Sequence, residues 1–341
     1  MAVSWSWAWG AETTTELDEM EFVRPTSGST QAPTSAAAEV YSYPTSPTRY
    51  SWETASVRTI RFPQKAFIDA GTVALPIRAD TTWYASSIGP LIQVYSGTSA
   101  TSINVYITNA GAGTVSLYVD NVLAGTTSLT ASNWHYLALQ YDMSGTTWTA
   151  TLYVDGTSAI TGSDTGLAAA TSGYYESGGF SGNTCTIGQF IVYDTGTVIA
   201  DAKTPVYCTR LSPANDISET GSWSPASNTG TDAVCAVTAN NPFDPATNTT
   251  LSLASSGDDQ ITQLTGINSA IGVLSTDMRG VTAHGYASGT NVNSYVAVDG
   301  GGGMVNGTQV TPDTSDTTYA FSSSAVTVAN TGNIDFKYEI A

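Results

Sequence analysis

The chain has 341 residues, of which 41% are hydrophobic and 10% aromatic, which is too much apolar and ring surface for a disordered protein. Its 28 acidic and 10 basic residues give a net charge of −18, which excludes favourable binding to the phosphate backbone of nucleic acids or to anionic lipid. No apolar run approaches the roughly 18 residues of a transmembrane helix, and the length suffices for two domains.

The amino terminus places Trp5, Trp7 and Trp9 at alternate positions. Residues 1–12 lack the basic start and unbroken apolar run of a signal peptide, so we expect synthesis in the cytoplasm without Sec export. The three tryptophans are candidates for contacts with neighbouring subunits.

A short acidic segment follows, and it predicts one of only two minor helices, at 14–22; the other is at 260–274. Glu16 and Glu21 within it satisfy the E-x-D-x-x-E pattern of concanavalin-like endoglucanases, in which two carboxylates flank the scissile bond. The preceding threonines also fit a helix cap with a solvated acidic first turn, which is the interpretation that we favour. Residues 24–48 are rich in Pro, Ser, Thr and Ala and predict a long surface loop or extended arm.

Period-two alternation then recurs along the chain and predicts β-hairpins. Residues 102–108 pair with 115–119 across a turn rich in Asn and Gly, and 134–141 pair with 148–154. Short strands at regular spacing indicate an antiparallel sandwich rather than a parallel α/β sheet. Trp83, Tyr84, Trp134 and Trp148 are expected in its core.

A second Pro-, Ser- and Asn-rich stretch, 203–232, predicts a domain boundary near Leu211. The three cysteines, Cys185, Cys208 and Cys235, show no C-x-x-C or Cys/His spacing. Buried free thiols and a single disulfide both remain open, and a zinc site is not expected.

Residues 132–141, followed by 148–156, resemble the W-h-x-h-a … h-y-h-D-G signature of laminin-G-like domains, and 185–194 resemble the closing strand of that family. Residues 5–12 and 56–62 resemble the first strands of such modules in phage virion proteins, where the first strand lies near the last. The resemblance implies an all-β fold, a laminin-G-like or concanavalin-like sandwich over 1–209, followed by a second, smaller β-sandwich domain over 210–341. The second part resembles a module of tailed-phage structural proteins.

This resemblance implies a non-enzymatic bacteriophage virion protein, made in the host cytoplasm and released on lysis. We expect it on the tail or head, assembled with other copies of itself as a symmetric oligomer, a trimer, and with other virion proteins. It would present the sandwich to a host-surface glycan. The alternatives are a capsid decoration protein with a mechanical role and, in another class, a concanavalin-like glycan hydrolase using Glu16 and Glu21.

Two sets of residues are candidates for a binding site. Rings exposed in the glycine-rich loop 172–183 would stack on a sugar: Tyr174, Tyr175 and Phe180. Because laminin-G-like sandwiches often hold a structural calcium ion, the turn carboxylates are candidate ligands, with hydrated surface carboxylates as the alternative: Asp155, Asp164, Glu176 and Asp194. No cofactor is expected otherwise, and no Ser, Cys or His arrangement of a hydrolase occurs in the sequence.

Overall fold

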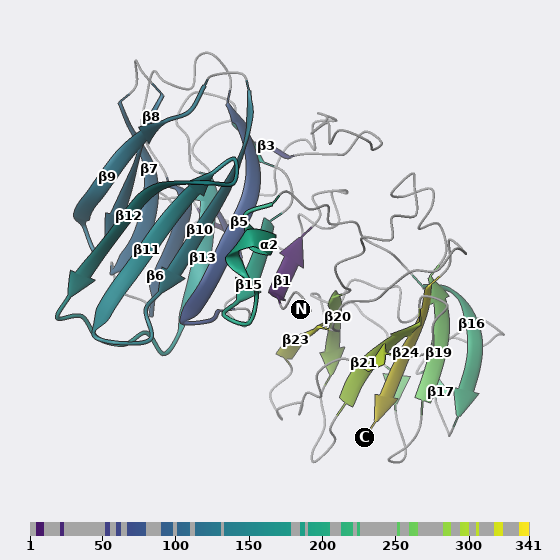
Figure 1. The fold of residues 1–341 in the computed structure, drawn as a ribbon. Coiled ribbons are helices and arrows are strands. Elements are labelled where there is room, and N and C mark those ends of the chain that lie inside the picture. The colour runs from purple at the N-terminus through teal and green to yellow at the C-terminus, as the bar shows by residue number, and fades with distance from the viewer. Residues whose placement is uncertain are drawn as a thin grey trace. The chain divides into compact units, whose positions relative to one another are not determined.

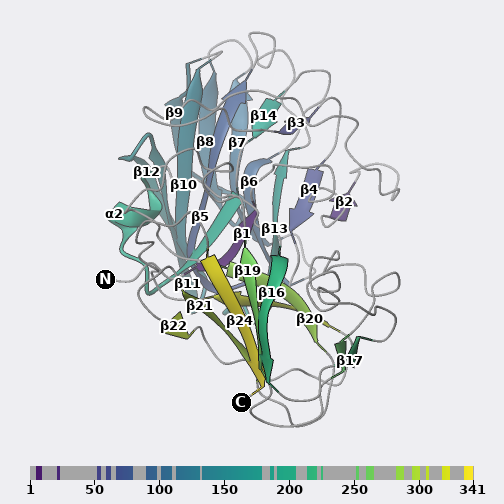
Figure 2. The ribbon, with the colours of Figure 1, turned by 90° about the vertical axis from the view of Figure 1, so that its right-hand side faces the viewer.

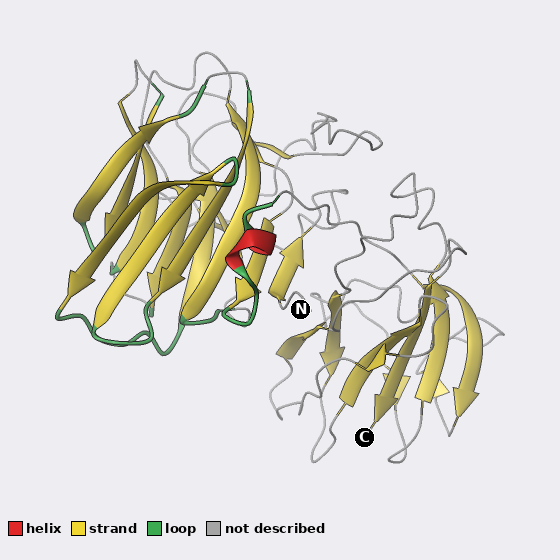
Figure 3. Cartoon of the chain, in the orientation of Figure 1, coloured by secondary structure: helices red, strands yellow, loops and turns green. Residues whose placement is uncertain are grey.

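The computed structural model confirms an all-β antiparallel chain (Figures 1 and 3). It describes residues 5–9, 21–23, 52–54, 59–62, 67–79, 90–97, 101–109, 113–130, 133–178, 185–187, 190–204, 213–220, 224–225, 251–252, 259–264, 282–287, 294–299, 305–306, 317–322 and 334–340. Contacts divide the chain into two compact units, which hold most of residues 1–208 and most of 209–341 respectively.

The first unit is a sandwich of an eight-stranded and a seven-stranded sheet. The eight-stranded sheet has the order β1 (Trp5–Trp9), β15 (Phe190–Asp194), β5 (Ala70–Ala79), β10 (Trp134–Asp142), β11 (Thr147–Val154) and β12 (Thr157–Thr165), with β14 (Cys185–Ile187) and β3 (Trp52–Thr54) paired beside β5. The seven-stranded sheet has the order β2 (Glu21–Val23), β4 (Thr59–Phe62), β13 (Gly173–Gly178), β6 (Pro90–Ser96), β7 (Ser102–Asn109), β8 (Thr114–Val119) and β9 (Val122–Ser128).

Both predicted hairpins are confirmed, as β7 with β8 and as β10 with β11. The pairing of β1 with β15 joins the first strand to the last strand of the sandwich, as the resemblance predicted. The predicted closing strand is two strands, β14 and β15, and a four-residue helix that was not predicted, α2 (Ile199–Ala202), follows them.

The core lies between the two sheets because every second residue of each strand points inward. Val73, Leu139 and Leu152 from the eight-stranded sheet, and Ile103 and Leu117 from the seven-stranded sheet, are fully buried. Trp148 is 1% exposed, which confirms its predicted core position, whereas Trp134 is half-buried. Trp83 and Tyr84 lie outside the described residues.

A tyrosine pair ties the two sheets together inside this core. The hydroxyl oxygens of Tyr141 on β10 and Tyr175 on β13 are 2.8 Å apart, and Ile68 N–H donates to Tyr175 Oη at 2.9 Å while Tyr141 Oη donates to Ile68 O at 2.8 Å. Burial is the main cause that raises the pKa of both phenols.

The sheets close on one another where β9 and β12 run side by side (Figure 2). Gly162 faces Ala124 so closely that a Cβ at position 162 would clash with the Ala124 side chain, and Gly125 faces Ile160 in the same way. Glycine at these two positions permits the close approach of the strands.

The second unit contains a five-stranded sheet of order β16 (Pro213–Thr220), β19 (Asp259–Leu264), β24 (Ile334–Ile340), β21 (Ser294–Asp299) and β22 (Val305–Asn306). Two strand pairs accompany it, β17 (Ser224–Pro225) with β18 (Leu251–Ser252) and β20 (Thr282–Ala287) with β23 (Thr317–Ser322).

The two helix predictions are wrong where the structure describes them. Residues 21–22 belong to β2, and residues 260–264 belong to β19, which is hydrogen-bonded to β16 on one side and to β24 on the other. Pairing on both sides overrides the weak helical preference of these short sequences. Among the described residues, no helix is long and apolar enough to cross a membrane.

Candidate functional site

The outer face of the seven-stranded sheet carries a line of hydrogen-bonding side chains that crosses neighbouring strands. Glu176 on β13 pairs with Gln93 on β6, Gln93 pairs with Asn104 on β7, and Asn104 pairs with Tyr118 on β8. Residues that pair directly across antiparallel strands share a face of the sheet. We call Glu176, Gln93, Asn104 and Tyr118 the polar row.

Three members of the polar row are buried although they lie on the outer face. Asn104 is 4% exposed, Gln93 is 5% exposed and Glu176 is 6% exposed. Their neighbours along each strand, such as Tyr175 and Val94, point into the sandwich core. Burying amide and carboxylate groups has an energetic cost unless each group finds a partner, so this face differs from an ordinary solvated sheet surface.

The two amides of the polar row converge on one hydroxyl group. Asn104 Nδ2 donates to Ser102 Oγ at 2.8 Å, and Gln93 Nε2 donates to the same oxygen at 3.3 Å. Asn104 Oδ1 is buried and accepts no hydrogen bond from any residue that the structure describes. The row therefore holds an oriented, buried acceptor for which the described residues supply no donor.

Tyrosine rings lie on both sides of the polar row. Tyr95 and Tyr174 stack with ring centroids 4.2 Å apart, and Tyr106 meets Tyr118 edge to face at 6.1 Å. Burial raises the pKa of Tyr106, the charge of Glu176 raises it further, and a hydrogen bond with Gln93 opposes them. Tyr106, Glu176 and Gln93 therefore interact as one group.

The prediction of exposed sugar-stacking rings is wrong for both tyrosines that the structure describes. Tyr174 is 8% exposed and Tyr175 is 0% exposed, because the first half of the predicted loop is strand β13. Tyr175 belongs to the core, and Tyr174 packs on Tyr95 beside the polar row. Phe180 lies outside the described residues.

The four candidate calcium ligands are not brought together. Asp155 follows the last residue of β11, whereas Asp164 pairs with Trp148 near the beginning of that strand. Asp194 ends β15 in the same sheet, and Glu176 lies on the other sheet. Among the described side chains, no three of the His, Cys, Asp and Glu residues form a group that could hold a metal ion.

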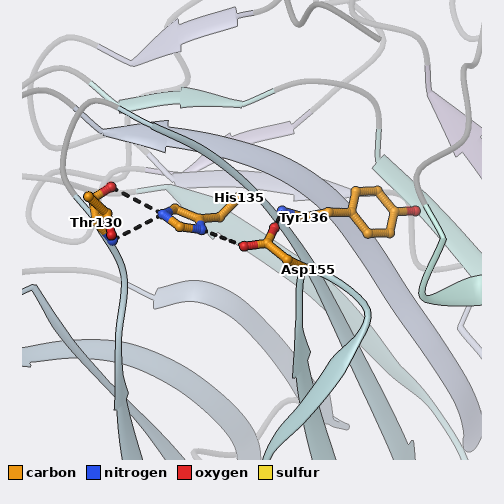
Figure 4. A network of polar contacts seen from close by, with 4 residues as sticks. All are labelled: Thr130, His135, Tyr136 and Asp155. Atoms are coloured by element: carbon orange, nitrogen blue, oxygen red, sulfur yellow. Dashed lines mark hydrogen bonds and ion pairs between the residues drawn. The ribbon is translucent and has the colours of Figure 1, made fainter. Parts of the chain in front are cut away.

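Asp155 instead belongs to a local network with the one histidine of the sandwich (Figure 4). His135 Nδ1 lies 2.8 Å from Asp155 Oδ2, and Tyr136 N–H donates to Asp155 Oδ1 at 2.8 Å. Thr130 N–H donates to His135 Nε2 at 3.0 Å. With Asp155 at φ +50° and Gly156 at φ +80°, the network holds the tight β11–β12 turn against the start of β10.

The remaining candidates are placed only by their backbones. Trp5, Trp7 and Trp9 lie in β1, and their role in assembly stays a prediction. Glu21 begins β2 and pairs with Arg61, which itself pairs with Glu176, so the backbone register continues the line of the polar row. Glu16 lies outside the described residues.

Sequence reasoning missed Gln93, Asn104 and Ser102. The alternation around 102–108 identified the apolar face of β7 and gave no prediction for the opposite face. A usable signal exists: Asn104 and Tyr106 occupy the outward positions of β7, and Gln93 and Tyr95 occupy those of β6, although Asn is depleted from strands in general.

No protein-family model matches the chain, and no curated protein sequence matches it either. Among solved structures, domain 4 of an extracellular GH43 arabinanase from Geobacillus stearothermophilus, in complex with arabinotriose, is 11% identical and aligns over 60% of this chain and 100% of its own, with a TM-score of 0.39. A carbohydrate esterase from Shiga toxin-encoding bacteriophage phi24B is 12% identical over 56% and 99% of the two chains, with a TM-score of 0.37. The carbohydrate recognition domain of Emp46p is 10% identical over 56% and 98%, with a TM-score of 0.37. Similarities at this level do not identify a family.

Proposed function

We propose that the first unit binds carbohydrate on the outer face of its seven-stranded sheet. The observation that carries the proposal is the polar row, in which a carboxylate and two carboxamides are nearly fully buried on an outer face and one amide oxygen has no donor among the described residues. Sugar hydroxyls both donate and accept hydrogen bonds, and Asn, Gln and Glu side chains supply the matching groups. The partly exposed rings of Tyr95, Tyr106 and Tyr118 supply flat apolar surface for the faces of sugar rings.

We propose that this binding is not coupled to hydrolysis. A glycosidase needs two carboxyl groups no more than about 9.5 Å apart. The backbones of Glu176 on β13 and Asp120, which follows β8, are three strand spacings apart, or about 14 Å at 4.8 Å each, whereas Glu21 of the hydrolase alternative is placed only by the register of β2. The hydrolase alternative becomes an outcome of the test below.

The setting that we propose is the one implied by the sequence resemblance, a symmetric oligomer exposed on a phage particle. Gold-labelled antibody against the chain on intact particles would locate it: label at the tail end supports adhesion to host glycan, and label spread over the head supports decoration. Light scattering at micromolar concentration tests the trimer, and a monomeric mass would contradict it.

The binding test starts with the full chain on an immobilised panel of neutral plant, fungal and bacterial glycans, followed by calorimetry. We expect Gln93→Ala to weaken the strongest interaction by about 10-fold, since one lost hydrogen bond to a sugar contributes about 1 kcal/mol or slightly more. Gln140→Ala is the matched control, because Gln140 is exposed on the outer face of the other sheet.

Each outcome of this test is informative. Binding that is lost with Gln93→Ala and kept with Gln140→Ala supports the proposal. An absence of binding across the panel, or equal loss with both variants, would overturn it, and release of reducing sugar by the wild-type chain would replace it with the hydrolase alternative.

A further inference from the structure

We infer that His135 is a pH-sensitive switch that acts on the backbone of Thr130 at one end of the sandwich. The uncharged imidazole holds Thr130 by its N–H group, and the protonated imidazole holds it by its carbonyl oxygen. The switch does not depend on carbohydrate binding. It gives the connection between β9 and β10 a response to pH, while the β11–β12 turn stays in place.

One ring nitrogen of His135 is committed to a carboxylate (Figure 4). Nδ1 lies 2.8 Å from Asp155 Oδ2, and a carboxylate only accepts hydrogen bonds, so Nδ1 carries a proton in both charge states of the ring. The Asp155 carboxylate is held in this orientation, because its Oδ1 accepts from Tyr136 N–H at 2.8 Å and the Asp155 N–H donates to Tyr136 O at 2.9 Å. Asp155 therefore fixes the tautomer of the uncharged ring.

The other ring nitrogen faces both backbone groups of one residue. Thr130 N lies 3.0 Å from His135 Nε2, and Thr130 O lies 3.1 Å from the same atom. Without a proton, Nε2 can only accept from the Thr130 N–H; with a proton, it can only donate to the carbonyl oxygen. A proton on Nε2 also points at the Thr130 N–H, so adding it breaks one hydrogen bond and makes the other.

The charge that His135 would gain has one ion-pair partner among the described residues, Asp155. Strand alternation places His135 on the inner face of β10, whereas Arg78 pairs with Trp134 on the outer face, and Lys203 Nζ lies over a tyrosine ring on that outer face. The His135 side chain is 13% exposed, so protons from solvent reach it. Neither described cation of this region therefore faces the imidazole from the inner side.

The chain next to Thr130 adds no charge and is anchored on one side. Residues 125–133 and the β7–β8 turn, 109–113, contain no ionisable side chain. Leu129 is 4% exposed, and its N–H donates to Gly113 O at 3.0 Å. Because Leu129 is held from one side and β10 begins at Trp134, the change of hydrogen bond acts on the short connection between them.

The experiment is NMR of the full ¹⁵N-labelled chain between about pH 5 and pH 8, where histidine side chains change charge. Imidazole ¹⁵N shifts report which ring nitrogens carry protons, and His284→Gln assigns the two histidines. At the alkaline end we expect the Nδ1-protonated tautomer and a protected Thr130 amide. At the acidic end, protection of Thr130 against hydrogen exchange, corrected for the intrinsic rate, should fall by about 5- to 10-fold, the effect of one lost hydrogen bond. The Tyr136 amide should keep its protection.

Asp155→Asn reverses the switch. The Asn oxygen would keep the hydrogen bond from Tyr136 N–H, which turns its NH₂ group toward His135 Nδ1 and favours the Nε2-protonated tautomer. The Thr130 amide should then be unprotected at both ends of the pH range. Asp142→Asn is the matched control, because Asp142 also accepts a backbone N–H in a turn and lies at the other end of β10. It should change neither the tautomer nor the Thr130 amide.

An Nε2-protonated tautomer in the wild-type chain at the alkaline end would overturn the inference, as would an imidazole that gains no proton over the range. Thr130 protection that stays constant while His135 gains its proton would also overturn it. So would an equal loss at Tyr136, because that would mean a general opening of this end of the sandwich. If Asp155→Asn does not fold, the tautomer and the contrast between Thr130 and Tyr136 test the inference on the wild-type chain.

Discussion

The two outer faces of the sandwich place polar residues in opposite physical situations. On the eight-stranded sheet, hydroxyl side chains from β11 and β12 pair in register and are mostly exposed, and the Oγ1 atoms of Thr151 and Thr161 are 3.2 Å apart. On the seven-stranded sheet, the corresponding outward positions hold the buried amides and carboxylate of the polar row. A polar residue on the outer face of a sheet is therefore not necessarily exposed to solvent.

A covered outer face can also be built from apolar side chains and tyrosine rings. Where α2 lies over the eight-stranded sheet, the covered residues form a small cluster of Ala74, Ala138 and Ile191 with the rings of Tyr136 and Tyr193. Burial of an outer face therefore does not require amides or carboxylates. Under the proposed function, Asn104 and Glu176 serve binding rather than stability, which the third prediction below tests.

The largest expected effect is the difference in stability loss between a buried tyrosine on one outer face and a half-buried tyrosine on the other. Tyr174→Ala should lower the free energy of unfolding by about 3 kcal/mol or more, because a buried aromatic ring leaves a cavity. Tyr153→Ala, on the half-buried outer face of the other sheet, should cost about 1 kcal/mol. Urea denaturation followed by fluorescence measures both, and equal losses would contradict the burial difference.

A second prediction concerns the residue next to Tyr174, on the inner side of the same strand. Tyr175→Phe should cost about 1 to 2 kcal/mol at neutral pH, because Ile68 N–H and Tyr141 lose a partner.

The same residue predicts a loss of stability in alkali. The unfolded phenol ionises near pH 10, while burial keeps the folded phenol neutral to a higher pH. The stabilising contribution is therefore complete below pH 10 and is lost as the pH rises above it. Thermal melts between pH 8 and 12 should show a shallower decline for Tyr175→Phe than for wild type, and parallel declines would contradict the assignment.

The third prediction tests whether the polar row sacrifices stability. Asn104→Val should raise the free energy of unfolding by about 1 kcal/mol, because it removes a buried acceptor that has no described donor and places a β-branched residue in a strand. Carbohydrate binding should be lost at the same time. A variant that is clearly less stable than wild type would show that Asn104 serves the fold.

A smaller effect should appear at Tyr106. Glu176→Gln removes the charge that raises the Tyr106 pKa, so that pKa should fall, yet stay above its ordinary value of 10 because burial is the larger cause. A pH titration by NMR with ring-labelled tyrosine, assigned with Tyr106→Phe, measures it. An unchanged Tyr106 pKa would show that the charge of Glu176 does not act on the Tyr106 phenol.

The smallest effect is expected at the exposed threonines of β11, on the outer face of the eight-stranded sheet. Thr149→Val should change the free energy of unfolding by no more than about 0.5 kcal/mol and should leave binding unaltered, because Thr149 is exposed. The same denaturation and calorimetry assays serve as the check: a larger loss of stability would show that Thr149 supports the fold, and a loss of binding would move the site to this face.

Much of the first unit follows from local pattern. The alternation of Ile103 and Val105 on β7, and the strand-like runs 134–141 and 148–154, predicted hairpins that the structure confirms, because period-two patterning and turn chemistry act over a few residues. The candidate site did not follow in this way. Tyr174 and Tyr175 sit in a glycine-rich stretch whose composition favours a loop, yet pairing with β4 and β6 makes it a buried strand.

The sequence by itself determined the all-β class, the positions of the central hairpins and the acidic surface, since each depends on neighbouring residues or on composition. Only the tertiary structure decided that Glu176, Gln93 and Asn104 lie in one line and are buried. The reason is physical: the sequence pattern around a polar residue at an outward strand position is the same whether water or other side chains surround that residue in the fold. Its surroundings are set by strands that pair from distant parts of the chain.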